Sequence, residues 1–496
     1  MAVKVDTQKE IIFGSSDPNI SRVISKKKKD GELRKLAPRI YTTNLIDSPA
    51  NIVRRNLIEI LAYRYPNALI SHRSAKEMRP TSTGDFFLTN STTRRVTDLP
   101  GIILNFVKGP KATAHDIPFI GMHISGEHRY MLENMQLSRK SGDESRVLPI
   151  SVIENKLEQL LLTGGEERLN QYRDELREVA NELGMADEFS KINNIISALL
   201  STHDARVLST DSAKARASGN PFDANRVGLF EILFDTIKDR YFVIRNNRNT
   251  DEDSFRLFSF FESYFSNYIE GTEFDIEEAK EIVDSGIPMP RRDEDSHDIL
   301  GTFKILSNRT EMRRVPTTPE ELFAILSHRH TILLEGRPHM NPGVFKMRNN
   351  RAGQTEFVDY QLVKGTLSQG FKYYSALTDP FARAIFMMFM ISEVHPFNDG
   401  NGRIARVMMN AEFVRADQSR IIVPTVFRED YILALRKLTR HKDPMAYINV
   451  MTKLHQFSDN LYGADFTELK NYLAACNAYE EPSQAKLQII DRSIRH

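Results

Sequence analysis

The chain has 496 residues, of which 41% are hydrophobic and 27% charged, so it has room for about three ordinary globular domains. Its single cysteine, Cys476, excludes an intramolecular disulfide and a cysteine-rich metal site. No run approaches the roughly 18 apolar residues of a membrane-spanning helix, and the N-terminus lacks the apolar core of a signal peptide, so we expect a cytoplasmic protein with no membrane partner.

The formal net charge of +1 hides an uneven distribution. Residues 1–110 carry 19 Lys and Arg against 10 Asp and Glu, a local net charge of +9. The run Lys26 to Lys29 lies in this part, and we expect a basic N-terminal segment over 1–40. Lys and Arg gain free energy by releasing counterions from phosphates, so residues 1–110 are a candidate DNA-binding region. The alternative is an ordinary solvated stretch of charge.

Residues 41–150 have the pattern of a small α+β domain. Apolar side chains at helical spacing predict a helix over 51–65. The segments 85–89 and 102–106 read as strands around the turn-like residues 91–95. Helices followed by a short hairpin favour a winged-helix-like arrangement.

Between these elements stands the phrase Ile70-Ser71-His72-Arg73-Ser74-Ala75. It resembles the start of AbiEi-type antitoxin and regulator domains, in which His-x-Ser-Ala follows a short apolar strand. The resemblance implies a regulator or a defence protein of the toxin–antitoxin type. We interpret His72 as a structural residue at a helix start rather than as a catalyst.

The next part of the chain is helical in pattern. Residues 151–221 form a predicted helical connector, in which 209–221 is small, polar and basic like a linker. A larger helical domain is expected over 222–460, followed by C-terminal helices over 461–496. Within it, Phe and Tyr at helical spacing predict a helix over about 255–271 that ends at Gly271. Ser266 and Glu270 share one face of that helix.

Residues 336–348 include Pro342-Gly343 between short apolar pieces. This turn chemistry predicts a β-hairpin, and the alternative is a simple connector.

Residues 395–406 read His-Pro-Phe-Asn-Asp-Gly-Asn-Gly-Arg-Ile-Ala-Arg. Apolar runs on both sides predict a helix, a tight polar loop, and a second helix that begins near Asn401. The N-terminus of a helix offers free N–H groups and a partial positive charge to an anion. Gly400 and Gly402 remove Cβ atoms that would keep a phosphate away from those groups. The loop is therefore a candidate polyphosphate site.

The side chains of this loop suit that chemistry. His395 titrates near neutral pH and could take a proton from a hydroxyl nucleophile. Asp399 is a hard oxygen donor of the kind that Mg²⁺ prefers. Asn401 could donate to an α-phosphate oxygen, and the guanidinium groups of Arg403 and Arg406 match phosphate oxygens.

The string resembles the signature of the Fic family, His-Pro-Phe-x-(Asp/Glu)-Gly-Asn-Gly-Arg-x-x-Arg, and fills every position of it. The resemblance covers about 225–460 and implies a mainly α-helical Fic domain with a small β-hairpin flap. It implies transfer of AMP from ATP to a Ser, Thr or Tyr hydroxyl of a target protein, with Asp399 as the ligand of Mg²⁺. It also implies a homodimer, because relatives often dimerise. The nucleotide-binding residues that it implies, besides the catalytic base His395, are Phe397, Asn398, Gly400, Asn401, Gly402, Arg403 and Arg406. From its residue type, we interpret Phe397 as an anchor of the loop in the core rather than as a substrate contact.

Two further segments match family patterns. Ser266 to Gly271 fits the inhibitory pattern (Ser/Thr)-x-x-x-Glu-(Gly/Asn), which implies that Glu270 pairs with Arg406 in the γ-phosphate position. The alternative is a solvent-facing Glu at a helix end. Residues 336–348 resemble the Pro-Gly-x-Φ-Arg segment ahead of the flap, which holds a target by strand addition. Lys346 replaces the family's Arg, and Lys346, Met347 and Gly353 are the target-positioning candidates.

Alternatives remain open. The same site could remove AMP, with Glu270 positioning a water molecule, or the Fic core could be the nucleotide sensor of a DNA-binding regulator. Phosphorylating relatives carry Ala and Lys at the positions of Gly400 and Gly402, which favours AMP transfer here. The motif leaves open whether the nucleotide is ATP or another, as well as the target, the trigger and the oligomeric state.

Overall fold

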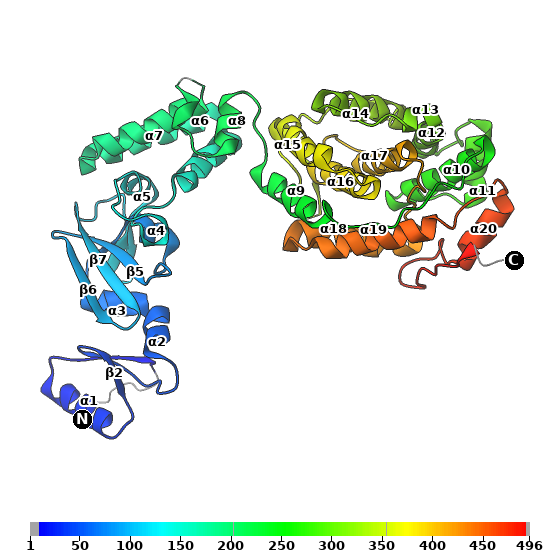
Figure 1. The fold of residues 1–496 in the computed structure, drawn as a ribbon. Coiled ribbons are helices and arrows are strands. Elements are labelled where there is room, and N and C mark those ends of the chain that lie inside the picture. The colour runs from blue at the N-terminus through cyan, green and yellow to red at the C-terminus, as the bar shows by residue number, and fades with distance from the viewer. Residues whose placement is uncertain (1–8, 202, 354, 493–496) are drawn as a thin grey trace. The chain divides into compact units, whose positions relative to one another are not determined.

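The computed structural model describes residues 9–201, 203–353 and 355–492. The chain divides into two compact units, Met1–Ser218 and Gly219–His496 (Figure 1). The first unit combines sheets with helices and the second is almost entirely helical, so the expected mainly α fold with an α+β N-terminal region is confirmed. The finer domain boundaries drawn from the sequence remain predictions.

The first unit opens with a three-stranded antiparallel sheet in the order β1-β3-β2. Its strands are β1 (Ile11–Phe13), β2 (Arg34–Ala37) and β3 (Ile40–Thr42). Helix α1 (Pro18–Lys29) precedes β2, and Asp17 caps it by accepting the N–H of Asn19. The lysine run forms the last turn of α1, where positive charge complements the helix dipole. A helix followed by a hairpin therefore occurs at 18–42, ahead of the region where the sequence pattern placed it.

A six-stranded mixed sheet follows, in the order β6-β7-β5-β4-β9-β8. Its strands are β4 (Leu69–Ile70), β5 (Asp85–Asn90), β6 (Arg94–Leu99), β7 (Ile102–Lys108), β8 (Ile117–Phe119) and β9 (Met122–Ile124). Strands β5 and β7 pair in parallel, and β6 pairs with β7 in antiparallel register.

The predicted hairpin of residues 85–89 and 102–106 is thus wrong in detail, because β6 forms between these two strands and begins at the end of the segment that reads as a turn. Strand β6 lies at the sheet edge and is mostly exposed, so it lacks the alternation of apolar residues that marks a half-buried strand. Arg94 packs its guanidinium over the ring of Phe106, 4.3 Å from the centroid. This contact supports a charged residue in a strand.

Helices cover the first unit. They are α2 (Pro49–Arg55), α3 (Leu57–Arg64), α4 (His72–Glu77), α5 (Glu127–Glu133), α6 (Ile150–Leu183), α7 (Ala186–Leu199) and α8 (Asp211–Ala217), with short 3-10 turns at Gly142–Glu144 and Ala205–Val207. The predicted helix 51–65 is in fact two helices that meet at Asn56. Helix α8, capped by Thr210, lies inside the segment predicted as a linker. Helix α6 kinks at Gly165, whose φ is +69°.

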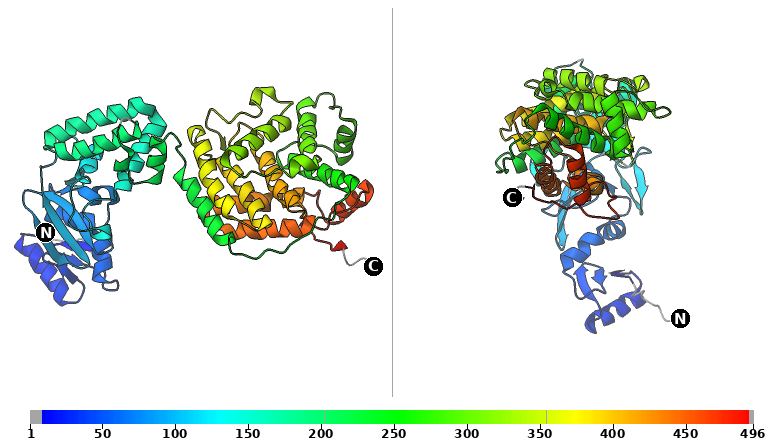
Figure 2. Two further views of the ribbon diagram at one scale, coloured as in Figure 1. Left: turned by 45° about the horizontal axis from the view of Figure 1, so that its top comes forward. Right: turned by 90° about the vertical axis from the view of Figure 1, so that its right-hand side faces the viewer.

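The second unit is a bundle built around α16 (Pro380–Val394) and α17 (Asn401–Arg415), which lie side by side in Figures 1 and 2. The helices around them are α9 (Ala224–Ile237), α10 (Glu252–Ile269), α11 (Ile276–Ser285), α12 (Asp293–Leu306), α13 (Arg309–Met312), α14 (Pro319–Leu333), α15 (Val363–Ala376), α18 (Arg428–His441), α19 (Pro444–Ser458) and α20 (Phe466–Ala475). Short 3-10 turns lie at Pro338–Met340, Tyr360–Leu362 and Thr425–Phe427. Residues Ala384 to Ile391 of α16 are fully buried, which makes this helix the centre of the unit.

A small antiparallel hairpin, β10 (Arg351–Ala352) and β11 (Thr355–Glu356), stands out from this bundle. We call residues 351–353 and 355–356 the flap. The prediction of a hairpin at 336–348 is wrong, because that segment holds a 3-10 turn and a bend at Gly343 without a partner strand. Gly343 has a φ of +79° and lies so close to α14 that a Cβ would stand 2.2 Å from Thr331 Oγ1.

In the described part of the chain, no helix combines the length and the apolar character needed to cross a bilayer.

Candidate active site

The loop between α16 and α17 has the predicted helix–loop–helix form. Helix α16 ends at His395, which adopts the left-handed conformation (φ 52°). Helix α17 begins at Asn401 after Gly400, whose φ of +72° favours glycine. The free N–H groups at this helix start therefore lie close to the imidazole in sequence and in space.

A cavity of about 450 Å³ lies over this loop. His395 and residues 398–402 line one side of it, Glu270 reaches it from the end of α10, and Arg406 reaches it from the second turn of α17. The flap and one face of α18 complete the wall. The structure thus brings together the loop, the predicted inhibitory residue and the flap.

His395 is oriented by two contacts. Its Nδ1 lies 3.2 Å from the carbonyl oxygen of Ser392, and because a carbonyl only accepts, Nδ1 carries the hydrogen and Nε2 keeps a lone pair. Its ring stacks on Phe357 at 3.6 Å between centroids and 5° between planes. Burial lowers the pKa of His395 to about 4, so the imidazole is neutral at physiological pH. A neutral imidazole with a free Nε2 can act as a general base.

The side chain of Asn401 binds the backbone of the loop. Its Oδ1 accepts the N–H of Phe397 at 2.9 Å and its Nδ2 donates to the carbonyl of Phe397 at 2.9 Å. The side chain therefore closes the loop on itself with one of its two amide hydrogens, and donation to an α-phosphate remains a prediction. Phe397 is fully buried and stacks on His330 at 3.7 Å, so it anchors the loop in the core. Asn398 is exposed at the cavity edge and donates to the carbonyl of Met340.

Gly402 is needed for a close approach, but the group that approaches is Glu270. A Cβ on Gly402 would lie 2.2 Å from Glu270 Oε1, so a larger residue here would displace the Glu270 carboxylate. The Glu270 carboxylate therefore lies at the positive start of α17, where an anion is stabilised.

Arg406 holds both polar residues of the predicted inhibitory pattern. Its Nη2 lies 2.7 Å from Glu270 Oε1 and 2.9 Å from the carbonyl oxygen of Ser266, and its Nε donates to Ser266 Oγ at 2.9 Å. Gly271 follows with a φ of +93° and turns the chain away from α10. The predicted pairing of Glu270 with Arg406 is thus present in the geometry.

Arg403 is held by residues of α10 and α12. Its Nη1 is 2.8 Å from Asp298 Oδ2 and 3.3 Å from Asn267 Oδ1, and its side chain is buried. Asp298 also binds Arg337 at 2.8 Å. Arg403 is thus held in a buried ion pair, with its Nη2 3.7 Å from Asp399 Oδ2 at the cavity, and its contact with a phosphate remains a prediction. No local pattern in the sequence signals Asp298 as the partner.

Asp399 fits a single-carboxylate magnesium ligand. Its side chain lines the cavity and is 39% exposed, and its Oδ1 accepts the N–H of Gly400 at 2.7 Å. Among the described residues, no cluster of three or more His, Cys, Asp or Glu side chains has the geometry of a metal site. Mg²⁺ commonly combines one or two carboxylates with substrate phosphates and water, and Asp399 beside a phosphate site has that character.

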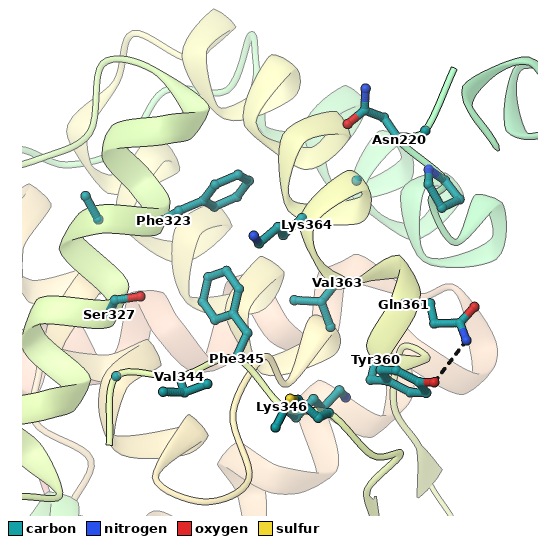
Figure 3. Close-up of a pocket in the computed structure, with 16 residues that line it drawn as sticks. Asn220, Phe323, Ser327, Val344, Phe345, Lys346, Tyr360, Gln361, Val363 and Lys364 are labelled. Carbon is teal, nitrogen blue, oxygen red and sulfur yellow. Dashed lines mark hydrogen bonds between the residues drawn. The ribbon is translucent and has the colours of Figure 1, made fainter. Parts of the chain in front are cut away.

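The flap candidates are placed differently from one another. Gly353 lies in the hairpin turn with a φ of +58°, and Met347 is 70% exposed. Lys346 is buried, and its Nζ donates to Asn350 Oδ1 at 2.7 Å. A second cavity of about 710 Å³ lies on the outer side of this segment, between α14 and α15 (Figure 3).

Other residues at the site went unnoticed in the sequence. Arg226, in the first turn of α9, pairs with Glu393 and donates to the carbonyl of Glu356 in the flap. Arg440 donates to Thr355 Oγ1 at 3.0 Å. Both guanidinium groups hold flap strand β11, and only tertiary structure brings them there.

In the first unit, His72 has the structural role that we expected. It is buried, its Nδ1 lies 3.0 Å from Ser71 Oγ, and its Nε2 lies 3.1 Å from Gln136 Oε1. Its backbone N–H donates to Glu133. Burial lowers the pKa of His72, which keeps the ring neutral.

The comparison with protein families decides the identity of the second unit's core. Residues 317–412, which contain the flap and the whole loop, match the Fic/DOC family. These residues form a Fic/DOC domain. Glu270 and the whole first unit lie outside the matched residues.

Curated relatives of the Fic/DOC domain carry adenylyltransferase names. The Protein adenylyltransferase Fic of Nematostella vectensis is 25% identical over 219 residues, which is 41% of this chain and 48% of that protein. The Protein adenylyltransferase fic-1 of Caenorhabditis elegans is 30% identical over 115 residues, 23% of this chain and 22% of that protein. The chain thus spans at most about half the length of these relatives. The solved structure of Fic-1 from C. elegans is 16% identical, covers 66% of this chain and 92% of its own, and has a TM-score of 0.36.

Proposed function

We propose that the chain is a protein adenylyltransferase, which moves AMP from ATP to a Ser, Thr or Tyr hydroxyl of a target protein and is restrained by Glu270. The observation that carries the proposal is the shared cavity of His395 and the start of α17. One group can take a proton and the other can hold phosphates. The adenylyltransferase names of the curated relatives agree with this activity.

In the reaction, Nε2 of His395 takes the proton of the target hydroxyl. The hydroxyl oxygen forms a bond to the α-phosphorus of ATP, the bond from that phosphorus to the bridging oxygen breaks, and pyrophosphate leaves. The N–H groups at the start of α17 face the negative charge on the phosphates, and glycine at 402 lets them come close. Mg²⁺, when bound at Asp399, would neutralise phosphate charge. The chain contributes mostly orientation and charge stabilisation.

Glu270 is the proposed brake. Its carboxylate neutralises Arg406 and lies over Gly402, which is where phosphates of ATP would need to come. Two anions cannot share that position without strong repulsion. ATP is therefore turned away from its productive pose until α10 or Glu270 moves.

Intact mass spectrometry tests this function. Glu270→Gly protein, incubated with ATP and MgCl₂, should gain the mass of AMP, and Glu270→Gly/His395→Ala protein should gain none while still binding ATP. Equal modification of both variants would remove His395 from the chemistry. If Glu270→Gly protein modifies neither itself nor any protein of an added cell lysate, the transferase activity is contradicted.

A second activity is favoured by the position of Glu270, which is 34% exposed and lines the same cavity as His395. A carboxylate there could orient a water molecule for removal of AMP from a modified protein. Wild-type protein would then remove AMP from a pre-modified target faster than Glu270→Gly protein does. The opposite order would leave transfer as the activity of the site.

Partners beyond ATP and a target protein remain predictions. DNA binding by residues 1–110 is supported by the lysine turn at the exposed end of α1. Electrophoretic mobility shifts of a DNA duplex with the full chain, measured across salt, test it, since phosphate contacts weaken steeply with salt. We likewise propose that the chain forms a homodimer and is located in the cytoplasm.

A further inference from the structure

Two residues just before the flap, Lys346 and Asn350, bind the backbone of the His395 loop. The backbone N–H of Lys346 donates to the carbonyl of Pro396 at 2.8 Å, and its side-chain Nζ lies 3.4 Å from the carbonyl oxygen of Val394. Asn350 Nδ2 donates to the carbonyl of Phe397 at 2.9 Å. Lys346 Nζ also binds Asn350 Oδ1 at 2.7 Å, which joins the two side chains. We call this pair the loop clamp.

The loop needs such partners because it leaves helical geometry. Helix α16 ends at the left-handed His395, so the carbonyls that follow have no partner in a next helical turn. Val394, Pro396 and Phe397 are buried, and a buried carbonyl without a partner costs free energy. The two side chains supply donors to the carbonyls of Val394 and Phe397, one on each side of His395. Asn401 shares the carbonyl of Phe397, and the backbone N–H of Lys346 binds that of Pro396.

Lys346 is an unusual residue for this place. It is only 3% exposed, and among the described residues no carboxylate forms an ion pair with its ammonium group. Burial lowers the pKa of Lys346 to about 8, which marks the cost of holding a cation there. Burying an ammonium group that binds only one amide oxygen and one carbonyl oxygen costs free energy of desolvation. The contacts that Lys346 makes with the loop offset part of this cost.

The loop clamp also reaches the flap. Asn350 immediately precedes β10 and lines the cavity that holds His395, and its backbone carbonyl accepts the N–H of Phe357 just after β11. Phe357 in turn stacks on the His395 ring. In Figure 3, Lys346 lies with Val344 and Phe345 in the wall of the second cavity, and Lys346 is absent from the residues that line the cavity of His395.

We propose that Lys346 and Asn350 are positioning residues that fix His395 and the base of the flap in one arrangement, which rests on the proposed transferase function. Lys346 then acts on the loop and not on the target backbone, in contrast to the role that the sequence resemblance implied. Loss of the clamp should displace the imidazole and lower the rate of transfer, while the ATP phosphates keep their contacts at α17.

The test uses the full chain with Glu270→Gly as the active parent. Lys346→Met keeps most of the length of the side chain and removes the Nζ donors, Lys346→Arg restores a side-chain donor, and Asn350→Ala removes the other half of the clamp. Lys364→Met, an exposed lysine in the same second cavity, is the matched control. We expect Lys346→Met and Asn350→Ala to lower the maximal auto-labelling rate at least about tenfold, since small misplacements of a catalytic group have such effects. The ATP concentration for half-maximal rate should change less than about threefold, and Lys346→Arg and Lys364→Met should stay near the parent.

A second readout is independent of activity. In ¹⁵N-histidine NMR spectra of the full chain, with the His395 signals assigned by His395→Gln, Lys346→Met and Asn350→Ala should shift the ring nitrogen resonances of His395, and Lys364→Met should not. If the parent is inactive, the transferase proposal fails and these spectra still decide on the clamp. Unchanged His395 resonances together with an unchanged rate would overturn the clamp. Unchanged resonances with a slower rate would return Lys346 to the target-binding role.

Discussion

Glu270 and Arg406 form an ion pair across the start of α17, with 2.7 Å between Oε1 and Nη2. The arginine is buried and holds the carbonyl and hydroxyl of Ser266 as well, whereas the carboxylate is 34% exposed at the cavity. The pair is therefore fixed on the arginine side and free to open on the glutamate side. This asymmetry is what a reversible brake requires.

Replacing Glu270 by Gly should raise auto-labelling with ATP by at least about tenfold, because Arg406 and the N–H groups of α17 become free for phosphates. Arg406 keeps its bonds to Ser266, so the free energy of unfolding should fall by only about 1 kcal/mol. Labelling rates and a denaturant titration measure both effects. Glu273→Gly removes an exposed glutamate three residues away and is the control. An equal rise in that variant would assign the effect to loosening of the chain after α10.

The C-terminal segment should hold the inhibitory helix in place. Tyr479 stacks on Phe265 of α10 at 5.4 Å and lies near Tyr264, and Tyr268 donates to Glu481. Tyr479→Ala should raise auto-labelling several-fold and destabilise the chain by about 2–4 kcal/mol, as expected for truncation of a packed aromatic side chain.

The matched control for this change is Tyr479→Phe. The Tyr479 hydroxyl is buried without a hydrogen-bond partner in the described part of the chain, so its removal should be neutral or slightly stabilising. Thermal unfolding and labelling rates of the two variants provide the comparison. If Tyr479→Ala labels itself at the wild-type rate, α10 stays in place without this contact.

Asp298 should be essential for stability, because Arg403 and Arg337 both depend on it. Asp298→Ala leaves a buried guanidinium without its carboxylate and should lower the free energy of unfolding by about 3–5 kcal/mol. Asp293→Ala, at the exposed start of the same helix, should change it by less than about 0.5 kcal/mol. Urea denaturation monitored by circular dichroism compares the two. Similar losses in both variants would contradict the buried ion pair.

Stability should fall as the pH is lowered from 7 to 5. Burial lowers the pKa of His395, His330 and His455 to about 4, below the ordinary value near 6.5. Between those values the unfolded chain binds more protons than the folded chain, so the free energy of unfolding rises with pH in this window and levels off below about pH 4. Urea midpoints measured from pH 7 to pH 4.5 test the slope, and His455→Gln should flatten it. If the urea midpoint of the wild type does not change with pH, protonation of these rings does not lower the free energy of unfolding.

The loop 395–406 was predictable because its information is local. The apolar runs on both sides fix the two helices, and glycine at 400 and 402 fixes where the chain turns, so the helix start at Asn401 followed from the sequence alone. The pairing of Glu270 with Arg406 could be expected only through the family pattern, because the two residues belong to different helices.

The remaining features depend on contacts between distant segments. Asp298 holds Arg403 in a buried ion pair, and Asn401 binds the backbone of Phe397, contacts that no local pattern in the sequence signals. Lys346 was a target-positioning candidate in the sequence, yet the residue is buried and its ammonium group binds Asn350 and the carbonyl of Val394. Strand β6 was missed since its charged, exposed sequence has no strand periodicity.

Labelling with ATP that carries the isotope in the α- or the γ-position tests the central claim most directly. With Glu270→Gly protein, the account expects retention of the α-label on protein, no retention of the γ-label, and loss of all labelling in Glu270→Gly/His395→Ala. Retention of the γ-label, or α-labelling that survives the loss of His395, would contradict it.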